Sequence, residues 1–343
     1  MGISLLREED KGQWDKYVME TEATNCYHLS GWKDVIERSF GHKTYYLFAE
    51  ENGVIRGILP LVHMKSLIFG SFMVSLPYFN YGGVCSNSKE IYNQLLNECV
   101  RIAKKENVGH IELRHVESID GSLPAKTTKV SMRLSLPQNT DELWDSLPSK
   151  LRSQIRRPQK EEMYARFGGE DELESFYKVF SLNMRDLGTP VYSKSFFKNI
   201  LREFPESSRI CTVYTRDGQP AASGFLVGFK DILEIPWASS LRSYNSYSPN
   251  MLLYWEVLKF ACEKGYKLFD FGRSTTGEGT YKFKEQWGAK PVQLYWHYWL
   301  KNGGQLPELN PDNPKYQMVI KTWQRLPVGL TKIIGPMIVR NIP

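Results

Sequence analysis

Hydrophobic and polar positions along the chain follow the helix and strand periods in turn, and the two halves give the same order of elements. The first half predicts helices over 14–20 and 32–40, a hairpin of 45–50 and 54–64, a strand over 72–76, a helix over 89–105 and a strand over 111–116. The second half predicts helices over 171–187 and 193–204, a hairpin of 209–215 and 221–229, a strand over 231–235, a helix over 250–263 and a strand over 267–271.

The turn and stop residues that separate these elements also repeat. They are offset by 165, 159 and 156 positions, for the pairs Gly53 and Gly218, Pro77 and Pro236, and Gly109 and Gly265. Nearly constant offsets, in order, indicate one supersecondary unit used twice. The alternative is coincidence between two common α+β patterns.

Gly, Ser, Pro and Thr cluster over 121–124 and 137–140, which places a domain boundary between residues 120 and 150. The expected parts are a first domain over 1–145, a second over 146–300, and a linker with a basic amphipathic tail over 301–343. The tail has five basic and no acidic residues after Asn313. Such a segment either lies on an anionic membrane surface or packs on the second domain.

Composition narrows the class of protein. The 343 residues carry 44 basic and 38 acidic side chains, a net charge of +6, which is too small for a dedicated nucleic-acid binder. Five scattered cysteines exclude a disulfide scaffold and a zinc ribbon and favour a reducing compartment. The charged start and the lack of a long apolar run predict a cytoplasmic protein without signal peptide or membrane span.

Several kinds of chemistry are missing from the sequence. It has no His-Glu-x-x-His, no Walker A motif, no Gly-x-Ser-x-Gly and no Gly-x-Gly-x-x-Gly after a strand. We therefore expect no metal and no bound cofactor. His115, in a predicted strand, fits a core or edge histidine better than a catalytic one, and Cys85 fits a small buried cysteine better than a nucleophile.

The segment 268–288 holds the densest set of chemical groups. A buried strand delivers Asp270, a Gly/Ser/Thr-rich loop follows, and Lys282 and Lys284 come after it. If the lysine segment is extended, the two lysines share a face and form a cradle for a phosphate or carboxylate. The alternative is a surface hairpin with solvated lysines.

Two other segments are candidates for binding. The stretch Lys150–Lys160 has five cations, and a helix would place Arg152 and Arg156 on one face. The alternative is that this segment is a solvated interdomain helix. Leu76–Val84 is an aromatic loop after a buried strand, which either lines a cleft or packs as an ordinary loop.

These segments resemble motifs of the FemAB family of tandem acyltransferases. Leu76–Val84 resembles the family's first-domain Pro-x-x-x-Tyr-Gly-Gly loop, and Lys150–Lys160 resembles the basic helix that opens its second domain. Phe269–Ser274 followed by Tyr281–Gly288 resembles its C-terminal signature and is the most specific match. The tail from Trp323 is similar to that of FemAB-like proteins associated with exosortase/PEP-CTERM and exopolysaccharide systems.

The resemblance implies an α+β fold of two tandem GNAT-like (acyl-CoA N-acyltransferase-like) domains, each a mixed, mostly antiparallel sheet flanked by helices. It implies an acyltransferase that works without a covalent enzyme intermediate and moves an aminoacyl or acyl group onto an amine of a cell-envelope precursor. The acceptor would be a peptidoglycan peptide or an exopolysaccharide amino sugar, and well-known members use aminoacyl-tRNA as donor.

Two departures from the patterns of these families bear on the donor. No long charged heptad arm is inserted in the second domain. Residues Ser246–Asn250 lack the Gln/Arg-x-x-Gly-x-Gly/Ala loop with which GNAT enzymes bind the pyrophosphate of acetyl-CoA. Acetyl-CoA is therefore the weaker of the two donors.

We expect the acceptor cleft at the domain interface, with Lys284 stabilising the charge of the tetrahedral intermediate. Asp270 is the second catalytic candidate, as a general base or as a structural hydrogen-bonding group. The remaining candidates bind phosphate or carboxylate groups or shape the cleft: Lys282, Arg273, Arg152, Arg156, Tyr78 and Tyr81. The alternatives are an acyl-CoA-dependent N-acyltransferase of exopolysaccharide biosynthesis and a non-catalytic glycan-binding assembly protein. The tail leaves peripheral contact with the inner face of the cytoplasmic membrane open.

Overall fold

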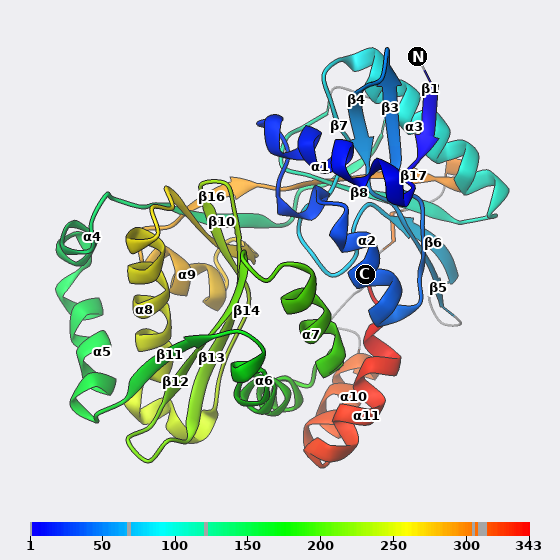
Figure 1. Ribbon diagram of the computed structural model, residues 1–343. Helices are drawn as coiled ribbons and strands as arrows, with labels where there is room; N and C mark the ends of the chain where they lie inside the picture. The colour runs from blue at the N-terminus through cyan, green and yellow to red at the C-terminus, as the bar shows by residue number, and fades with distance from the viewer. Residues whose placement is uncertain (1, 67–69, 120–122, 304–305, 308–313) are drawn as a thin grey trace. The chain divides into compact units, whose positions relative to one another are not determined.

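The computed structural model describes residues 2–66, 70–119, 123–303, 306–307 and 314–343 (Figure 1). The chain forms two compact units. The first consists of residues 1–129, 293–309 and 340–343, and the second of 130–292 and 310–339. Part of the expected boundary, at 121–122, and most of the linker after 303 lie outside the described residues.

The first unit contains two sheets and three α-helices among its described residues. Its helices are α1 (Lys11–Glu20), α2 (Gly31–Phe40) and α3 (Lys89–Lys105). One sheet has the order β1 (Gly2–Leu5), β3 (Leu47–Glu51), β4 (Val54–Leu59), β7 (Cys85–Ser86). The other has the order β2 (Lys43–Thr44), β5 (Val62–Ser66), β6 (Gly70–Val74), β8 (His110–His115), β17 (Tyr295–Leu300), β9 (Ala125–Lys126).

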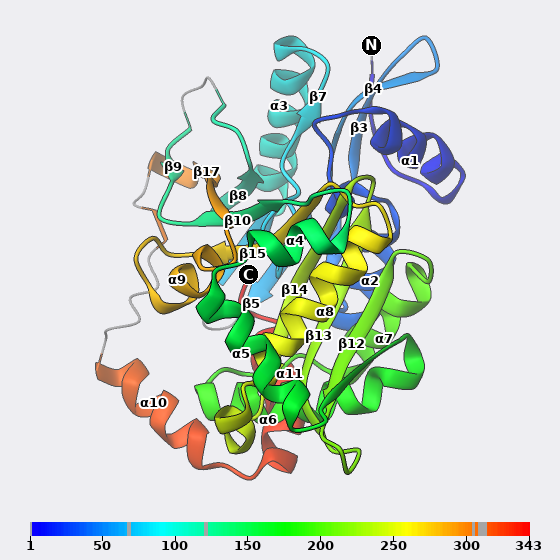
Figure 2. The same ribbon diagram turned by 90° about the vertical axis from the view of Figure 1, so that its left-hand side faces the viewer.

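The second unit is built around one seven-stranded sheet. Its order is β11 (Tyr164–Gly168), β12 (Ser208–Tyr214), β13 (Pro220–Phe229), β14 (Ile232–Ser240), β15 (Leu268–Ser274), β10 (Val130–Ser135), β16 (Lys290–Gln293). The helices are α4 (Thr140–Ser146), α5 (Ser149–Lys160), α6 (Leu173–Leu187), α7 (Lys194–Glu203), α8 (Pro249–Glu263), α9 (Gly279–Glu285), α10 (Pro314–Arg325) and α11 (Val328–Val339). Helix α8 covers one face of the sheet, and α6 and α7 cover the other (Figures 1 and 2).

The predicted repeat is present. In the first unit β6 and β8 are parallel and are joined through α3, and in the second unit β14 and β15 are parallel and are joined through α8. The strand that continues each sheet comes from the other half of the sequence, because β17 pairs with β8 and β10 pairs with β15. Ladder hydrogen bonds therefore assign residues 130–145 to the second unit and 293–300 to the first, whereas we expected a boundary at 145.

Three local expectations differ from the structure. The second arm of the first hairpin, predicted over 54–64, is divided into β4 and β5, which belong to different sheets. The strand expected to end before Pro236 continues to Ser240 as β14. A register shift opposite Leu226 places Pro236 in a β-bulge, where its missing N–H interrupts no ladder bond. The segment with Lys282 and Lys284 is the helix α9 and not an extended strand.

The helical conformation of α9 follows from two aromatic residues spaced four apart. Phe283 and Trp287 both approach Tyr254 of α8, with ring centroids 5.0 and 6.1 Å away. This is the spacing that puts two side chains on one helix face. The packing on α8 of Phe283, in α9, and of Trp287, in the turn after it, therefore supports the helical conformation.

The tail packs on the second unit, which is one of its two expected placements. Ile320 of α10 lies against Gly188 at the end of α6, and Trp323 is buried. The Arg185 guanidinium donates to the Leu326 carbonyl over 3.0 Å. Among the described helices, none combines the length and apolar character needed to cross a bilayer.

Candidate functional site

The parallel strands β14 and β15 separate in the middle of the sheet. They pair only over Ile232–Glu234 and Leu268–Asp270. Beyond this point β14 stays paired with β13, and β15 stays paired with β10 as far as Ser274. The two candidate catalytic residues lie at this fork.

Asp270 is the last residue of β15 that pairs with β14, and it is 1% exposed. Its Oδ1 accepts hydrogen bonds from the Ser131 hydroxyl over 2.6 Å and from the Gly272 amide over 2.7 Å. Its Oδ2 accepts from Arg133 Nε over 3.1 Å. A carboxylate held by three donors is suited to fixing β10 against β15, which is the structural role considered for Asp270 in the sequence.

The Lys284 ammonium is buried at the end of β15, with 8% of the residue exposed. It donates to the carbonyl oxygens of Gly272 over 3.0 Å and of Arg273 over 2.9 Å. Burial lowers the pKa of Lys284 from 10.5 to about 8, although the nearby Asp270 carboxylate opposes the shift. At neutral pH the amine is therefore mostly protonated, and the solvated lysine of the alternative interpretation is not what the structure contains.

Glu234 is a second buried acid at the fork, and the sequence analysis missed it. It is 4% exposed and lies in register with Asp270 on the adjacent strand. Its charge also raises the pKa of Lys284. The sequence did contain a signal for it. Ile232–Ile235 is an apolar run that predicts a buried strand, and the single carboxylate inside it needs a partner when it is buried.

Arg273 and Lys282 lie near Lys284 in the chain but differ from it in exposure. Both side chains are exposed, Arg273 at the end of β15 and Lys282 on α9. The structure thus brings Asp270, Arg273 and Lys284 together. Of the three cations Arg273, Lys282 and Lys284, Lys284 alone is withdrawn from solvent.

The helix predicted for Lys150–Lys160 is confirmed as α5, and Arg152 and Arg156 both face α4. Arg152 Nη1 lies 3.6 Å from the Asp145 carboxylate, and the Arg156 guanidinium lies 5.2 Å from the Trp144 ring centroid. Arg156 is exposed and Arg152 is half-buried. These contacts leave both cations at the surface.

The aromatic loop Leu76–Val84 belongs to the first unit. Tyr78 has a φ of 74°, and its hydroxyl lies 2.8 Å from His42 Nε2 and donates to the Arg340 carbonyl over 3.0 Å. Tyr81 is 3% exposed and lies 6.0 Å from the Tyr27 ring. Both tyrosines pack within the first unit, whereas the fork of β14 and β15 belongs to the second unit.

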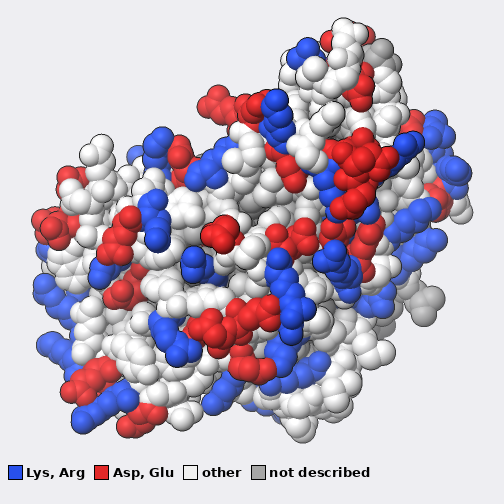
Figure 3. All heavy atoms as spheres, in the orientation of Figure 1, with Lys and Arg blue, Asp and Glu red and all other residues white. Residues whose placement is uncertain are grey.

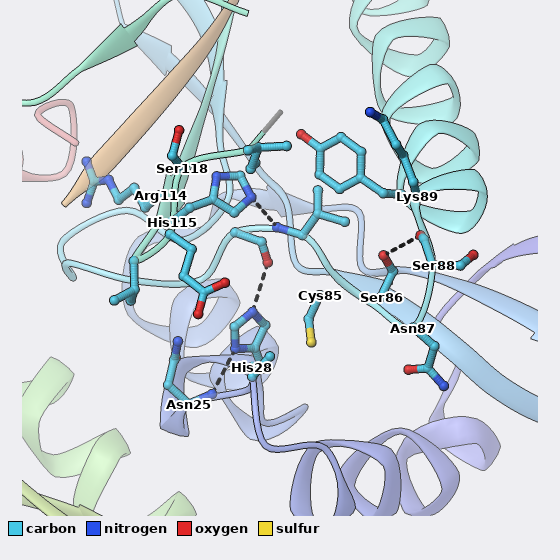
Figure 4. Close-up of a pocket in the computed structure, with 17 residues that line it drawn as sticks. Asn25, His28, Cys85, Ser86, Asn87, Ser88, Lys89, Arg114, His115 and Ser118 are labelled. Atoms are coloured by element: carbon cyan, nitrogen blue, oxygen red, sulfur yellow. Dashed lines mark hydrogen bonds between the residues drawn. The ribbon is translucent and has the colours of Figure 1, made fainter. Parts of the chain in front are cut away.

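The same loop ends at a cavity of about 450 Å³ in the first unit, formed by residues 23–28, 83–92 and 114–119 (Figure 4). Gly83 has no substitute there, since a Cβ would lie 2.3 Å from the His115 ring. His115 Nε2 accepts from the Val84 amide over 2.9 Å, and burial lowers the pKa of His115 to about 3. The imidazole is therefore a neutral wall of the cavity, as expected for a core histidine, and Cys85 is buried as expected.

Charged side chains of both signs are interspersed over the face shown in Figure 3. No group of His, Cys, Asp and Glu among the described residues could hold a metal ion. On the face in Figure 3 the charges therefore do not form a field of one sign that would attract an anion.

The second unit is similar to known acetyltransferase domains. A family model for an acetyltransferase (GNAT) domain matches residues 148–285, which include the fork, Asp270 and Lys284. A search of curated proteins gave no significant match.

Solved structures resemble the whole chain. The structure of FemX matches with 15% identity and a TM-score of 0.68, over 93% of this chain and 100% of that one. The C-terminal domain of a putative lysylphosphatidylglycerol synthetase from Agrobacterium fabrum matches with 12% identity and a TM-score of 0.57, over 92% and 96%. A tandem GNAT protein from the clavulanic acid biosynthesis pathway matches with 13% identity and a TM-score of 0.52, over 89% and 99%.

At these identities the likeness concerns the fold, and it confirms the prediction of two tandem GNAT-like domains. Together with the GNAT family match, it shows a FemX-like fold whose second unit resembles an acetyltransferase domain. The association with exosortase and exopolysaccharide systems stays a prediction.

Proposed function

We propose that the chain is a FemAB-like acyltransferase that transfers an aminoacyl or acyl group from an activated ester to an amine of a cell-envelope precursor. One observation carries the proposal: a buried ammonium, Lys284, sits on the end carbonyls of β15 where two parallel strands separate. Asp270 and Glu234 lie beside it. A cytoplasmic location, where both kinds of donor occur, is part of the proposal.

The reaction needs no covalent enzyme intermediate. The acceptor amine attacks the ester carbonyl, and the carbonyl oxygen becomes an oxyanion in the tetrahedral intermediate. Lys284 donates two of its three hydrogens to Gly272 and Arg273, which leaves one for that oxyanion. The carbonyls fix the ammonium beforehand, so it has little to reorganise when charge develops. Collapse of the intermediate expels the alcohol of the donor and leaves an amide.

The acids keep the lysine charged. Burial alone favours the neutral amine, and the Asp270 and Glu234 carboxylates oppose that effect, so the pKa stays near 8. We assign Asp270 to holding β10, β15 and Lys284 in place, and Glu234 is the candidate to receive the proton of the attacking amine. Exposed Arg273 and Lys282 are candidates for donor phosphates or carboxylates.

The start of α8 favours aminoacyl-tRNA over acyl-CoA as donor. In this unit α8 is the helix that follows the first strand of the fork, and it begins with Pro249, preceded by Ser248 with a φ of 59°. Proline has no N–H, so this terminus offers one donor fewer to a pyrophosphate. Arg152 and Arg156 then become contacts for the donor's phosphates.

The acyl-CoA-dependent N-acyltransferase remains the second candidate, because the family model that matches residues 148–285 is that of an acetyltransferase. A non-catalytic glycan-binding protein is the third. All three share the fold, so only an assay with defined donors separates them.

The assay supplies labelled aminoacyl-tRNA or labelled acetyl-CoA to the purified chain with a peptidoglycan precursor peptide or an amino sugar. We expect amide product from aminoacyl-tRNA, and a Lys284→Met chain serves as the matched blank. Product from acetyl-CoA alone would replace the proposal by the second candidate. Binding of the acceptor without product from either donor would replace it by the third.

A further inference from the structure

The C-terminal helices α10 and α11 have two different faces. Thr331, Gly335 and Val339 of α11 recur every four residues and are buried. A Cβ on Gly335 would lie 2.8 Å from the backbone of Val191, so this face rests tightly on the second unit. Trp323 extends the buried face onto α10.

The opposite face is apolar and open. The described residues include eleven exposed large hydrophobic side chains, and five of them are in these two helices of twelve residues each. The five are Met318 at 71%, Val319 at 62%, Leu330 at 40%, Ile333 at 69% and Met337 at 66% exposure. On α11 they follow i, i+3 and i+7, which makes one stripe. We call these five residues the tail stripe.

Within α10 and α11 the charge beside the tail stripe has one sign, and an acid of α6 next to these helices, Asp186, is paired with Arg185. Lys321 and Arg325 are exposed on α10 and follow Met318 at i+3 and i+7, so they lie on the same face as that methionine. From Pro314 to Pro343 the sequence has no Asp or Glu. An apolar stripe with only cations beside it is complementary to a surface that is anionic outside and apolar beneath.

We propose that the tail stripe docks on anionic phospholipid, with α10 and α11 lying in the plane of the membrane surface. The buried face of the helices stays on the second unit, so docking needs no unfolding of the tail. At twelve residues, α11 is about 18 Å long, too short to span a bilayer of about 30 Å. Docking would hold the protein where lipid-linked envelope precursors occur, but it does not depend on the activity proposed above.

The test is co-sedimentation of the full chain with vesicles of phosphatidylcholine alone or mixed with phosphatidylglycerol. We expect binding to the mixed vesicles, weaker binding to phosphatidylcholine, and loss of binding at high salt. Ile333→Asp with Met337→Asp removes two apolar contacts and adds two negative charges, so affinity should fall about 100-fold or more. Both positions are exposed, so the melting temperature should not change.

Two controls separate the stripe from general surface effects. Met19→Asp changes a methionine of the first unit that is 53% exposed, and it should leave vesicle binding unchanged. Lys321→Gln with Arg325→Gln should weaken binding about 25-fold, at about fivefold per cation, whereas Lys104→Gln with Lys105→Gln on α3 should not.

Three results would overturn the proposal. The first is wild-type protein that stays in the supernatant with mixed vesicles, and the second is equal binding by wild type and the Ile333/Met337 variant. The third is a dimer in the absence of vesicles that the same variant converts to a monomer, because the stripe would then be covered by a second copy of the chain.

Discussion

In the first unit β8 carries a buried acid, Glu112, at the point where it pairs with β6, and in the second unit β15 carries Asp270 at the matching point with β14. In each case a residue of the strand from the other half of the sequence donates a hydrogen bond to the acid. Tyr298 of β17 donates to Glu112 over 2.7 Å, and Ser131 of β10 donates to Asp270 over 2.6 Å. The repeated scaffold thus keeps an acid at the centre of both sheets.

The acid of each unit pairs with an arginine, but among the described residues only the second unit adds a buried lysine. In the first unit it is Arg114, which is 2% exposed, donates to Glu112 over 2.7 Å and lies 4.3 Å from the Trp296 ring. A guanidinium does not lose its proton near neutral pH. In the second unit it is Arg133, whose Nε lies 3.1 Å from Asp270 Oδ2, and the added lysine is Lys284, whose pKa burial lowers to about 8. The comparison indicates a structural centre in the first unit and a chemically adjustable one in the second.

The largest effect we predict tests the first half of this comparison. Arg114→Met leaves the Glu112 carboxylate buried with one partner fewer, so the free energy of unfolding should fall by about 3–5 kcal/mol. The control Arg101→Met removes an exposed partner of Glu98 and should change the free energy of unfolding little. Chemical denaturation of both variants measures the difference. Equal losses would mean that Arg114 does not hold the first unit together.

The second prediction concerns the adjustable cation. Lys284→Met removes the donor proposed for the oxyanion, so kcat should fall by roughly 100- to 1000-fold, or about 2.7–4 kcal/mol of barrier. Lys282→Met on the same helix removes an exposed ammonium and should act chiefly on KM. Steady-state kinetics with the donor identified by the assay above provides both values.

The free energy of unfolding of these variants distinguishes a catalytic role of Lys284 from a structural one. Lys284→Met leaves the Gly272 and Arg273 carbonyls without their donor, which costs on the order of 1–3 kcal/mol, partly offset because a buried charge is removed. The alternative of a solvated lysine does not hold for this ammonium, which is buried. Normal kcat in a folded Lys284→Met chain would contradict the assignment, and an unfolded chain would make the lysine structural.

The third prediction is a pH profile. Lys284 acts as ammonium, so kcat should fall about tenfold per pH unit above its pKa of about 8. Glu234 raises this pKa, so Glu234→Gln should move the alkaline limb to lower pH. Lys284→Met should lack the limb. If the alkaline limb of Glu234→Gln stays at the wild-type pH, the Glu234 carboxylate does not influence the pKa of Lys284.

How much of this could be predicted depended on whether the signal was local. Helix α3 was predicted with its observed bounds, since Ser88 caps the Ile91 amide and its apolar stripe is regular. The exchange of β10 and β17 was not predicted, because alternation along a strand does not identify the partner strand.

The site shows the same division. The loop composition of 268–288 led to Asp270, Arg273 and Lys284, which the structure brings together at the end of β15. The burial of Lys284 was missed, because it follows from packing of Phe283 and Trp287 on α8. Glu234 was missed because its neighbour Asp270 is far away in the sequence.

The smallest effect we predict extends the comparison to α5, whose cations belong to the second unit only. If Arg152 and Arg156 contact donor phosphates, Arg152→Ala with Arg156→Ala should raise KM about fivefold and leave kcat unchanged. The effect is modest, about 1 kcal/mol, because both guanidiniums are accessible to solvent and already contact α4. The matched control Arg157→Ala with Lys160→Ala removes two exposed cations from the same helix. A KM that rises equally in both variants would reduce α5 to a general electrostatic contribution, and an unchanged KM would return it to a solvated helix.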